Sequence, residues 1–380
     1  METLCYANLQ FSLDLFKKLS EIDKSGNVFF SPLNISTALT MVHLGAGGNT
    51  ATQMEQVLHL SKIKESVHSE FSNLMSIINN KESTSALHMA NRLFGEKTFH
   101  FAKNFLDETR KLYQAELEGV DFITSSESAR QNINAWVEKK TEGKIVNMLS
   151  EGAVDPMTKL FLVSAIYFMG DWQKKFRIHN TKEAQFRLNK KDTKTVMMMY
   201  KSAKFNYALL PDVNAQIIEL PYQGGDLSMF VLLPKDIEDE STGLEEIEKQ
   251  LTYENLTKWT SKENLHYTKM NLYLPRFKME GTYNLKKYLS SMGMTDVFHT
   301  SKCDLSGISS SQGLYVSEVI HKAFVDVNEE GTVAAAATGL IAKVLCYVFP
   351  QVFKADHPFI FFIRHNKSNS ILFSGRVCSP

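Results

Sequence analysis

Apolar side chains in the first 155 residues recur mostly three or four positions apart, which is the spacing of helices. Near the amino terminus, Leu9, Leu13 and Phe16 follow this spacing with polar residues between them, so an amphipathic helix is predicted there. Four more helices are predicted over residues 36–44, 50–60, 105–113 and 128–140. Thr50 is the predicted cap of the second of these, because a threonine hydroxyl can accept from the first free backbone N–H groups.

The later part of the chain carries shorter apolar runs that are typical of strands. Nearly unbroken runs, which suit strands buried on both faces, cover residues 159–168, 215–220 and 227–233. Further strands are predicted over residues 271–277, 314–319 and 323–328, and residues 359–364 and 370–375 are predicted to form a closing hairpin. Helices come first and strands later, without regular alternation, and this order predicts the α+β class.

The composition is that of one globular unit. No Pro/Gly/Ser-rich linker, low-complexity segment or repeat divides the 380 residues, so we expect a single domain over 1–380. The chain has 42 basic and 42 acidic residues and a formal net charge of zero, which argues against general binding to nucleic acid or to acidic membranes. No apolar run approaches the roughly 18 residues of a membrane span.

The amino-terminal residues and the cysteines both bear on the compartment. Residues 1–18 lack a basic segment followed by an uninterrupted apolar stretch, so no cleaved signal peptide is expected. Only four cysteines occur, which is too few to staple a chain of this length. We therefore expect a cytoplasmic protein with free thiols, whose release from cells, where it occurs, needs no cleaved signal.

We find no arrangement of residues typical of an enzyme or of a cofactor site. The glycines of residues 45–48 lack the lysine of a phosphate-binding loop and follow a predicted helix instead of a strand. His299 and Cys303 are four residues apart, but Gly293 and the loop-like residues around them argue against a metal site. Cys346 has no visible histidine or helix start to lower its thiol pKa. The sequence thus predicts no catalysis, no cofactor and no metal.

One segment conflicts with its own local propensity. Two acidic residues and a run of four alanines should form a helix, but Gly331 and Gly339 bracket the run and no apolar periodicity follows. Small residues also suit a segment that must enter a crowded sheet. The residues of this hinge segment are Glu329, Glu330, Gly331, Thr332, Val333, Ala334, Ala335, Ala336, Ala337 and Thr338.

Together with motifs spread over the whole chain, this segment resembles the hinge and reactive centre loop of the serpins. The motifs include Asn27-Val-Phe-Phe-Ser-Pro32, Glu219-Leu-Pro-Tyr222, Leu274-Pro-Arg-Phe-Lys278 and Asp356-His-Pro-Phe359. Each alone is weak, but their order and spacing together are specific. The short amino terminus and the ending at Ser379-Pro380 are similar to the ovalbumin-related intracellular branch of that family.

The resemblance implies a serpin fold and a suicide-substrate inhibitor. The expected fold has a large central mixed sheet, two further sheets, about eight to nine helices and an exposed reactive centre loop at about 329–357. In serpins the scissile bond lies fourteen residues beyond the hinge glycine, which places it between Leu345 and Cys346. A protease attacks the Leu345 carbonyl, and the loop then inserts into the large sheet and traps the acyl-enzyme.

The same resemblance assigns residues to the opening of the sheet. Arg276 is expected opposite Glu329, with Trp172 packed nearby. A polar cluster is expected beneath the sheet. Asn34 stands where the family usually has serine, and Ser164 stands where it has asparagine, so the amide and the hydroxyl have exchanged places. The other members of that cluster are Ser31 and His321.

Two features of the loop bear on its targets and on its insertion. Leu345 suits chymotrypsin-like and, less well, elastase-like proteases, and a reactive bond one or two residues later would present Cys346 or Tyr347 to the same classes. Thr332, Ala334, Ala336 and Thr338 would share the inward face, because strand residues alternate. Val333 stands where most inhibitory serpins carry glutamate, but on the outward face.

The resemblance implies a monomer that can polymerise through its loop. Two other functions remain open: a non-inhibitory serpin that acts as a binding protein, and a cross-class inhibitor of papain-like cysteine proteases.

Overall fold

The computed structural model describes residues 2–63, 66–79, 86–332 and 350–380. Within these ranges it contains nine α-helices, and four of them, α1 to α4, precede residue 79. The helices are α1 Glu2–Ile22, α2 Pro32–His43, α3 Gly48–Val57, α4 Val67–Ile78, α5 Lys103–Tyr113, α6 Phe122–Lys140, α7 Glu245–Gln250, α8 Tyr253–Trp259 and α9 Lys286–Ser291. No described helix is long and apolar enough to cross a bilayer.

The described strands form two sheets. The six-stranded sheet is mixed and has the order β10-β11-β12-β4-β2-β3, with β4 parallel to β11 and antiparallel to β2. Its strands are β2 Ala86–Glu96, β3 Leu117–Val120, β4 Leu160–Asp171, β10 Phe277–Asn284, β11 Val316–Val327 and β12 Gly331–Thr332.

The nine-stranded sheet has the order β1-β15-β14-β8-β7-β6-β9-β13, and β5 pairs with β6 outside this path. Its strands are β1 Val28–Phe30, β5 Lys182–Arg187, β6 Thr193–Leu210, β7 Ala215–Pro221, β8 Leu227–Pro234, β9 His266–Pro275, β13 Gln351–Lys354, β14 Phe359–His365 and β15 Ser370–Val377. The 18-residue β6 pairs with β5, β9 and β7 in turn. The two smaller sheets expected from the sequence are therefore joined through β6 into one hydrogen-bonded ladder.

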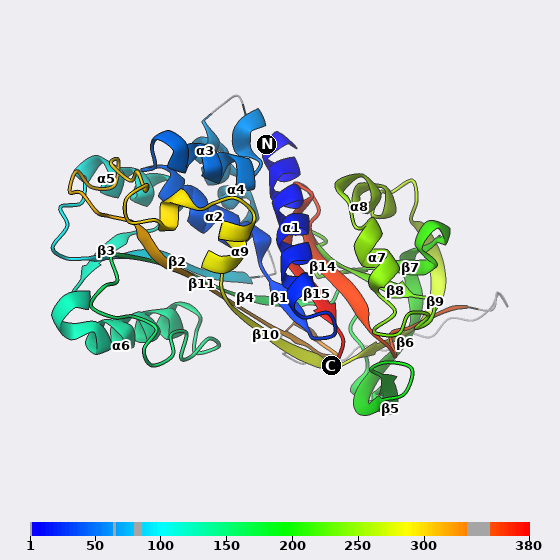
Figure 1. The fold of residues 1–380 in the computed structure, drawn as a ribbon. Helices are drawn as coiled ribbons and strands as arrows, with labels where there is room; N and C mark the ends of the chain where they lie inside the picture. Colours follow the sequence, from blue (N-terminus) through cyan, green and yellow to red (C-terminus); the bar gives the residue numbers. More distant parts are fainter. Residues whose placement is uncertain (1, 64–65, 80–85, 333–349) are drawn as a thin grey trace.

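The unbroken apolar run of β4 packs against different layers on its two faces. Leu160, Leu162 and Phe168 belong to the main core, which includes α1 and α2. Phe161 and Tyr167 point the other way, into a second core beneath α6. Figure 1 shows α2 and α6 on opposite sides of this sheet. The prediction of a strand buried on both faces is confirmed.

Several local predictions were incomplete or wrong. Helix α3 begins at Gly48 with Gly47 as its N-cap, so Thr50 lies inside the helix and is not its cap. The two strands predicted over 314–319 and 323–328 are parts of one strand, β11, which covers only Val316–Val327, whereas residues 271–277 are divided between β9 and β10. The three strands β1, β2 and β3 lie in the part that we predicted as helical. β2 was missed because its period-two alternation is interrupted by polar Asn91 and Arg92.

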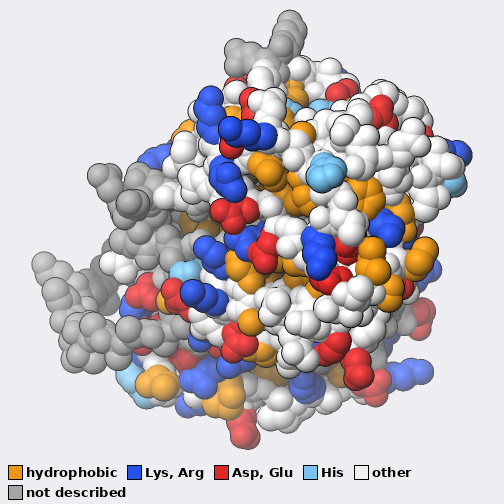
Figure 2. Space-filling model, turned by 90° about the vertical axis from the view of Figure 1, so that its left-hand side faces the viewer, with side chains coloured by type: hydrophobic (Ala, Val, Ile, Leu, Met, Phe, Trp, Pro, Cys, Tyr) orange, Lys and Arg blue, Asp and Glu red, His pale blue; other side chains and the backbone are white. Residues whose placement is uncertain are grey.

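The face that carries α5 and α6 has lysine and arginine interspersed with aspartate and glutamate (Figure 2). This mixture agrees with the formal net charge of zero for the whole chain.

Candidate functional site

The candidate site begins at β12, where two residues enter the six-stranded sheet. The backbone of Gly331–Thr332 pairs antiparallel with β4 on one side, and Thr332 pairs with Val327 of β11 on the other. Farther along the same two strands, β11 and β4 pair directly with each other, up to Phe324 opposite Tyr167. The two strands therefore separate beyond that pair, and β12 occupies the gap between them.

Only glycine fits at the first position of β12. Gly331 has a φ of +147°, and a Cβ atom there would lie 2.1 Å from the carbonyl oxygen of Gly170 and 2.7 Å from the backbone nitrogen of Trp172. Side chains avoid both this backbone conformation and such contacts. The hinge glycine that the sequence identified is thus required by the close approach of β12 to β4.

Glu329 is held by a buried ion pair at the entry to β12. Its side chain is 7% exposed and accepts from Arg276, whose Nε lies 2.8 Å from both carboxylate oxygens. The hydroxyl of Thr181 donates to the same carboxylate at 2.5 Å. Burial opposes ionisation of Glu329, but these hydrogen bonds outweigh it and hold the pKa of the carboxyl below its usual value.

Trp172 and Glu330 fix the backbone on either side of this pair. The indole of Trp172 stacks on Tyr222 with ring centroids 4.6 Å apart, and its Nε1–H donates to the Asn328 carbonyl at 2.9 Å. Its backbone N–H donates to the carbonyl of Glu330 at 2.8 Å. The Glu330 carboxylate lies 2.7 Å from Lys175 Nζ. The segment before β12 is therefore anchored through both backbone and side chains.

Ser31, Asn34, Ser164 and His321 lie together as one fully buried polar cluster. The Asn34 amide donates to the Ser164 hydroxyl at 2.9 Å, and Ser164 in turn lies 3.0 Å from His321 Nδ1. The Ser31 backbone N–H donates to His321 Nε2 at 3.0 Å, and the Ser31 hydroxyl donates to the Leu372 carbonyl at 2.6 Å. The cluster joins β11 and β4, which carry His321 and Ser164 opposite each other, to α2.

The cluster requires a neutral imidazole. Because Nε2 of His321 accepts from a backbone N–H, the ring proton lies on Nδ1 and is donated to Ser164. A second proton would place N–H against the N–H of Ser31. Complete burial lowers the pKa of His321 to about 3, although its hydrogen bond to Ser164 acts in the opposite direction.

Sequence reasoning missed three side chains that complete these contacts. Asn91 of β2 donates to the Asn34 side-chain oxygen at 2.8 Å and so orients its amide toward Ser164. Thr181 and Lys175 complete the contacts of Glu329 and Glu330. A polar residue inside an alternating strand was the only signal for Asn91, and nothing in the sequence marked the other two.

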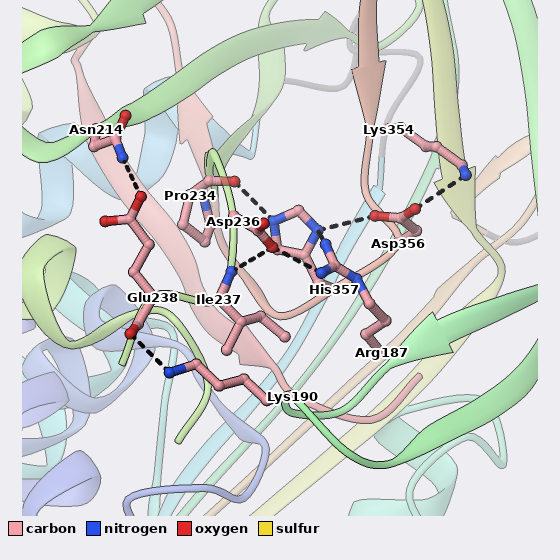
Figure 3. A network of polar contacts seen from close by, with 10 residues as sticks. All are labelled: Arg187, Lys190, Asn214, Pro234, Asp236, Ile237, Glu238, Lys354, Asp356 and His357. Atoms are coloured by element: carbon pink, nitrogen blue, oxygen red, sulfur yellow. Dashed lines mark hydrogen bonds and ion pairs between the residues drawn. The ribbon is translucent and has the colours of Figure 1, made fainter. Parts of the chain in front are cut away.

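The chain beyond the loop is anchored by a second polar network, drawn in Figure 3. His357 is buried, and its ring nitrogens face Asp356 Oδ1 at 2.9 Å and the Pro234 carbonyl at 2.7 Å. Lys354 Nζ lies 3.0 Å from the other Asp356 oxygen. Burial opposes ionisation of Asp356, but the hydrogen bonds from His357 and Lys354 outweigh it and lower the pKa of this carboxyl. β13 is thereby tied to the end of β8.

The remaining predicted site residues, Val333, Ala334, Ala335, Ala336, Ala337, Thr338, Leu345 and Cys346, lie outside the described residues. Among the residues that the structure does describe, no group of three or more histidine, cysteine, aspartate or glutamate side chains could hold a metal ion.

The low pKa of His321 predicts an acid-labile fold. Between pH 6.5 and about 3 the unfolded chain takes up a proton at this ring that the folded chain excludes, so the free energy of unfolding falls as the pH falls. From pH 7 to pH 5 this amounts to about 2 kcal/mol. We expect His321→Gln to lose less stability over that range than the parent, in urea unfolding at both pH values. The exposed control His179→Gln should behave as the parent, and equal losses in all three proteins would contradict the assignment.

Comparison with known proteins gives a consistent result. A family model described as Serpin (serine protease inhibitor) matches residues 6–380. The human leukocyte elastase inhibitor is 53% identical over 381 residues, and that of the horse (Equus caballus) is 54% identical over 380, each alignment covering 100% of both chains.

Solved structures agree with the sequence matches. Uncleaved ovalbumin superposes with a TM-score of 0.90 at 36% identity, covering 100% of both chains. Maspin gives a TM-score of 0.92 at 40% identity over 100% of this chain and 99% of its own. With a matching model over nearly its whole length, full-length relatives above 50% identity and the sheet described above, this chain belongs to the serpin family of serine protease inhibitors.

Proposed function

We propose that this protein is an intracellular inhibitor of the suicide-substrate type, which traps chymotrypsin-like or elastase-like serine proteases as acyl-enzymes after cleavage between Leu345 and Cys346. The observation that carries the proposal is β12, whose two residues lie between β11 and β4 where these strands have separated. As a serpin, the protein inhibits proteases and is not itself an enzyme.

The sheet supplies a reason for insertion to be favourable. β12 is antiparallel to both of its neighbours, whereas β11 and β4 are parallel to each other over Val316–Phe324. A strand that continued from β12 would replace one parallel pairing by two antiparallel ones. Antiparallel pairs are slightly more stable per residue, and the inserted strand would satisfy a further set of backbone groups.

The hinge composition suits the two layers that the inserted strand would meet. One layer is the main core beneath α2 and the other is the core beneath α6, and both are apolar. Ala334 and Ala336 can enter such a layer at little steric cost, but a charge there would lack a partner. Insertion would carry the acylated protease with it, and a distortion that costs its catalytic site even ~4 kcal/mol slows deacylation about a thousandfold.

We propose that residues 1–380 form a single serpin domain with a reactive centre loop at about 329–357. We propose that the protein is a cytoplasmic monomer. Full-length similarity to proteins named as elastase inhibitors favours an inhibitor over a binding protein. Inhibition of papain-like cysteine proteases is tested separately, by incubation with papain in place of chymotrypsin.

The reactive bond can be mapped directly. We expect incubation with chymotrypsin to give a complex that survives boiling in detergent, because the acyl bond is covalent. Mass spectrometry should find a released carboxy-terminal peptide that begins at Cys346. A peptide beginning at Val344 or Val348 would show that the bond lies elsewhere, and cleavage without a stable complex would contradict inhibition.

Loop insertion can be blocked at one residue. We expect Ala334→Arg to convert the inhibitor into a substrate, because a buried guanidinium without a partner costs several kcal/mol. The loop should still be cut after Leu345, no covalent complex should persist, and the cleaved form should gain little heat stability. The control Val333→Glu, on the outward face, should keep trapping. Unchanged stoichiometry in Ala334→Arg would rule out insertion for this chain.

The Arg276–Glu329 pair is proposed to restrain opening of the sheet. Glu329→Lys removes the buried carboxylate and sets two cations against each other, although the 37% exposure of Arg276 lets solvent screen part of this repulsion. We expect this variant to form polymers on mild heating, since a sheet that opens readily can accept the loop of another molecule. Native gels over a temperature series should show monomer for the parent and for the exposed control Glu183→Lys. Equal monomer fractions in all three would remove the proposed role.

A further inference from the structure

A group of positive side chains lies on the nine-stranded sheet beside the carboxy-terminal end of the loop. Lys204 of β6 and Lys269 of β9 are directly opposite each other, and both are exposed. Like charges at directly opposed positions destabilise a sheet. Neither lysine forms an ion pair with a residue that the structure describes, and the contact that partly offsets the repulsion is that of Lys204 Nζ with the Tyr267 ring, 5.8 Å from its centre.

Two further residues extend this group along the sheet. Lys174 Nζ donates to the Lys204 carbonyl at 2.6 Å and to the Tyr267 hydroxyl at 2.8 Å, and it lies 5.0 Å from the centre of the Tyr267 ring. Tyr267 is itself 62% exposed. Lysine 174 is therefore fixed in place beside the other two, with an accessible aromatic ring between them. We call Lys174, Lys204, Lys269 and Tyr267 the cationic strip.

A neighbouring lysine on the inner face of the sheet also lies close to these charges. Lys201 of β6 lies on the inner face of the same sheet, where its Nζ donates to the carbonyl of Lys175. Burial, together with the charges of Lys174 and Arg177, lowers the pKa of Lys201 to about 8. No salt bridge to a carboxylate is found for Lys174, Lys201 or Arg177 among the described residues. A chain with zero net charge thus has an unbalanced positive region here.

The strip adjoins the end of β13 that the loop enters. β13 runs parallel to β9, and its first residue, Gln351, pairs with Met270, the residue directly after Lys269. Figure 1 shows β6 and β9 together at the same end of the molecule, far from α5 and α6. The proposed reactive bond, between Leu345 and Cys346, lies only five residues before Gln351, so a protease bound there is expected within about 20 Å of this surface.

We propose that the cationic strip is a second contact for the target protease. In the complex, the strip lies against an acidic surface beside the substrate cleft of the protease. The proposal rests on the proposed inhibitory function and adds the surface charge of the target to it. Complementary charge mainly speeds association, so the strip selects acidic chymotrypsin-like proteases by the rate at which they reach the loop.

The test compares two forms of one protease. Chymotrypsin and chymotrypsin succinylated on its lysines, first shown to keep its turnover of a small peptide substrate, are each reacted with the parent at low salt. We expect the parent to associate with the succinylated enzyme about tenfold faster, and this ratio to approach one at 1 M salt because the charges are then screened. In Lys204→Glu/Lys269→Glu the ratio should fall to one or below.

Two controls separate a local effect from a change in net charge. Lys103→Glu/Lys111→Glu carries the same charge change on α5, on the face where both signs are interspersed (Figure 2), and should keep the ratio of the parent. Lys204→Arg/Lys269→Arg should also keep it. The same ratio in the charge-reversed strip variant and in the parent would overturn the proposal. A rate that depends on the strip only when dextran sulfate is added would identify a polyanion as its ligand and would also overturn it.

The proposed inhibitory function is tested separately in the same samples, by the formation of a detergent-stable complex. If neither enzyme form gives a detergent-stable complex with the parent, inhibition itself is contradicted. If complexes form but their association rates are unchanged by both pairs of lysine substitutions, only the proposed role of the cationic strip is contradicted.

Discussion

The parallel pairing of β11 with β4 is the contact on which the rest of this structure depends. It closes the large sheet over Val316–Phe324, and it is broken at the end where β12 enters. Because a further strand could complete the sheet with two antiparallel pairings, the observed arrangement leaves hydrogen-bonding capacity unused. Three features lie along these two strands and bear on whether they separate further. They are the ion pair of Glu329, the stacking of Trp172 and the buried cluster around His321.

The two polar groups that hold the sheet together differ in physical character. The Arg276–Glu329 pair lies at the separated end and combines opposite charges with 37% exposure of the arginine, so solvent can reach one partner. The cluster beneath the strands is neutral and wholly buried, and each member depends on the orientation of the next. Buried networks of this kind favour one arrangement of their strands because a partial rearrangement leaves polar groups without partners.

How much the sequence predicted depended on whether the signal was local. The continuous apolar run of β4 predicted burial on both faces because every residue of the strand meets a core layer. Gly331 was identified by its place in a motif, and the structure supplies the reason in the missing space for a Cβ. Asn91 carried only a weak signal and Thr181 none, because their roles arise from contacts with residues more than 50 positions away. β2 was missed for a related reason, since Asn91 faces the buried cluster and Arg92 pairs with Glu116 and Glu118 on the other face, and both interrupt the apolar alternation.

The fixed segments on both sides of the loop have a consequence for what cleavage of the loop does to the molecule. Before the loop, Gly331 is seated in one sheet, and after it, β13 is paired with β9 and tied through His357 to β8. Because the intact chain connects these two fixed segments, its length limits how far β12 could extend while β13 stays paired with β9. One broken peptide bond removes that tether while both sheets stay as they were. Under the proposed mechanism, the protein responds to the continuity of its own chain, because a single covalent event decides whether the large sheet rearranges.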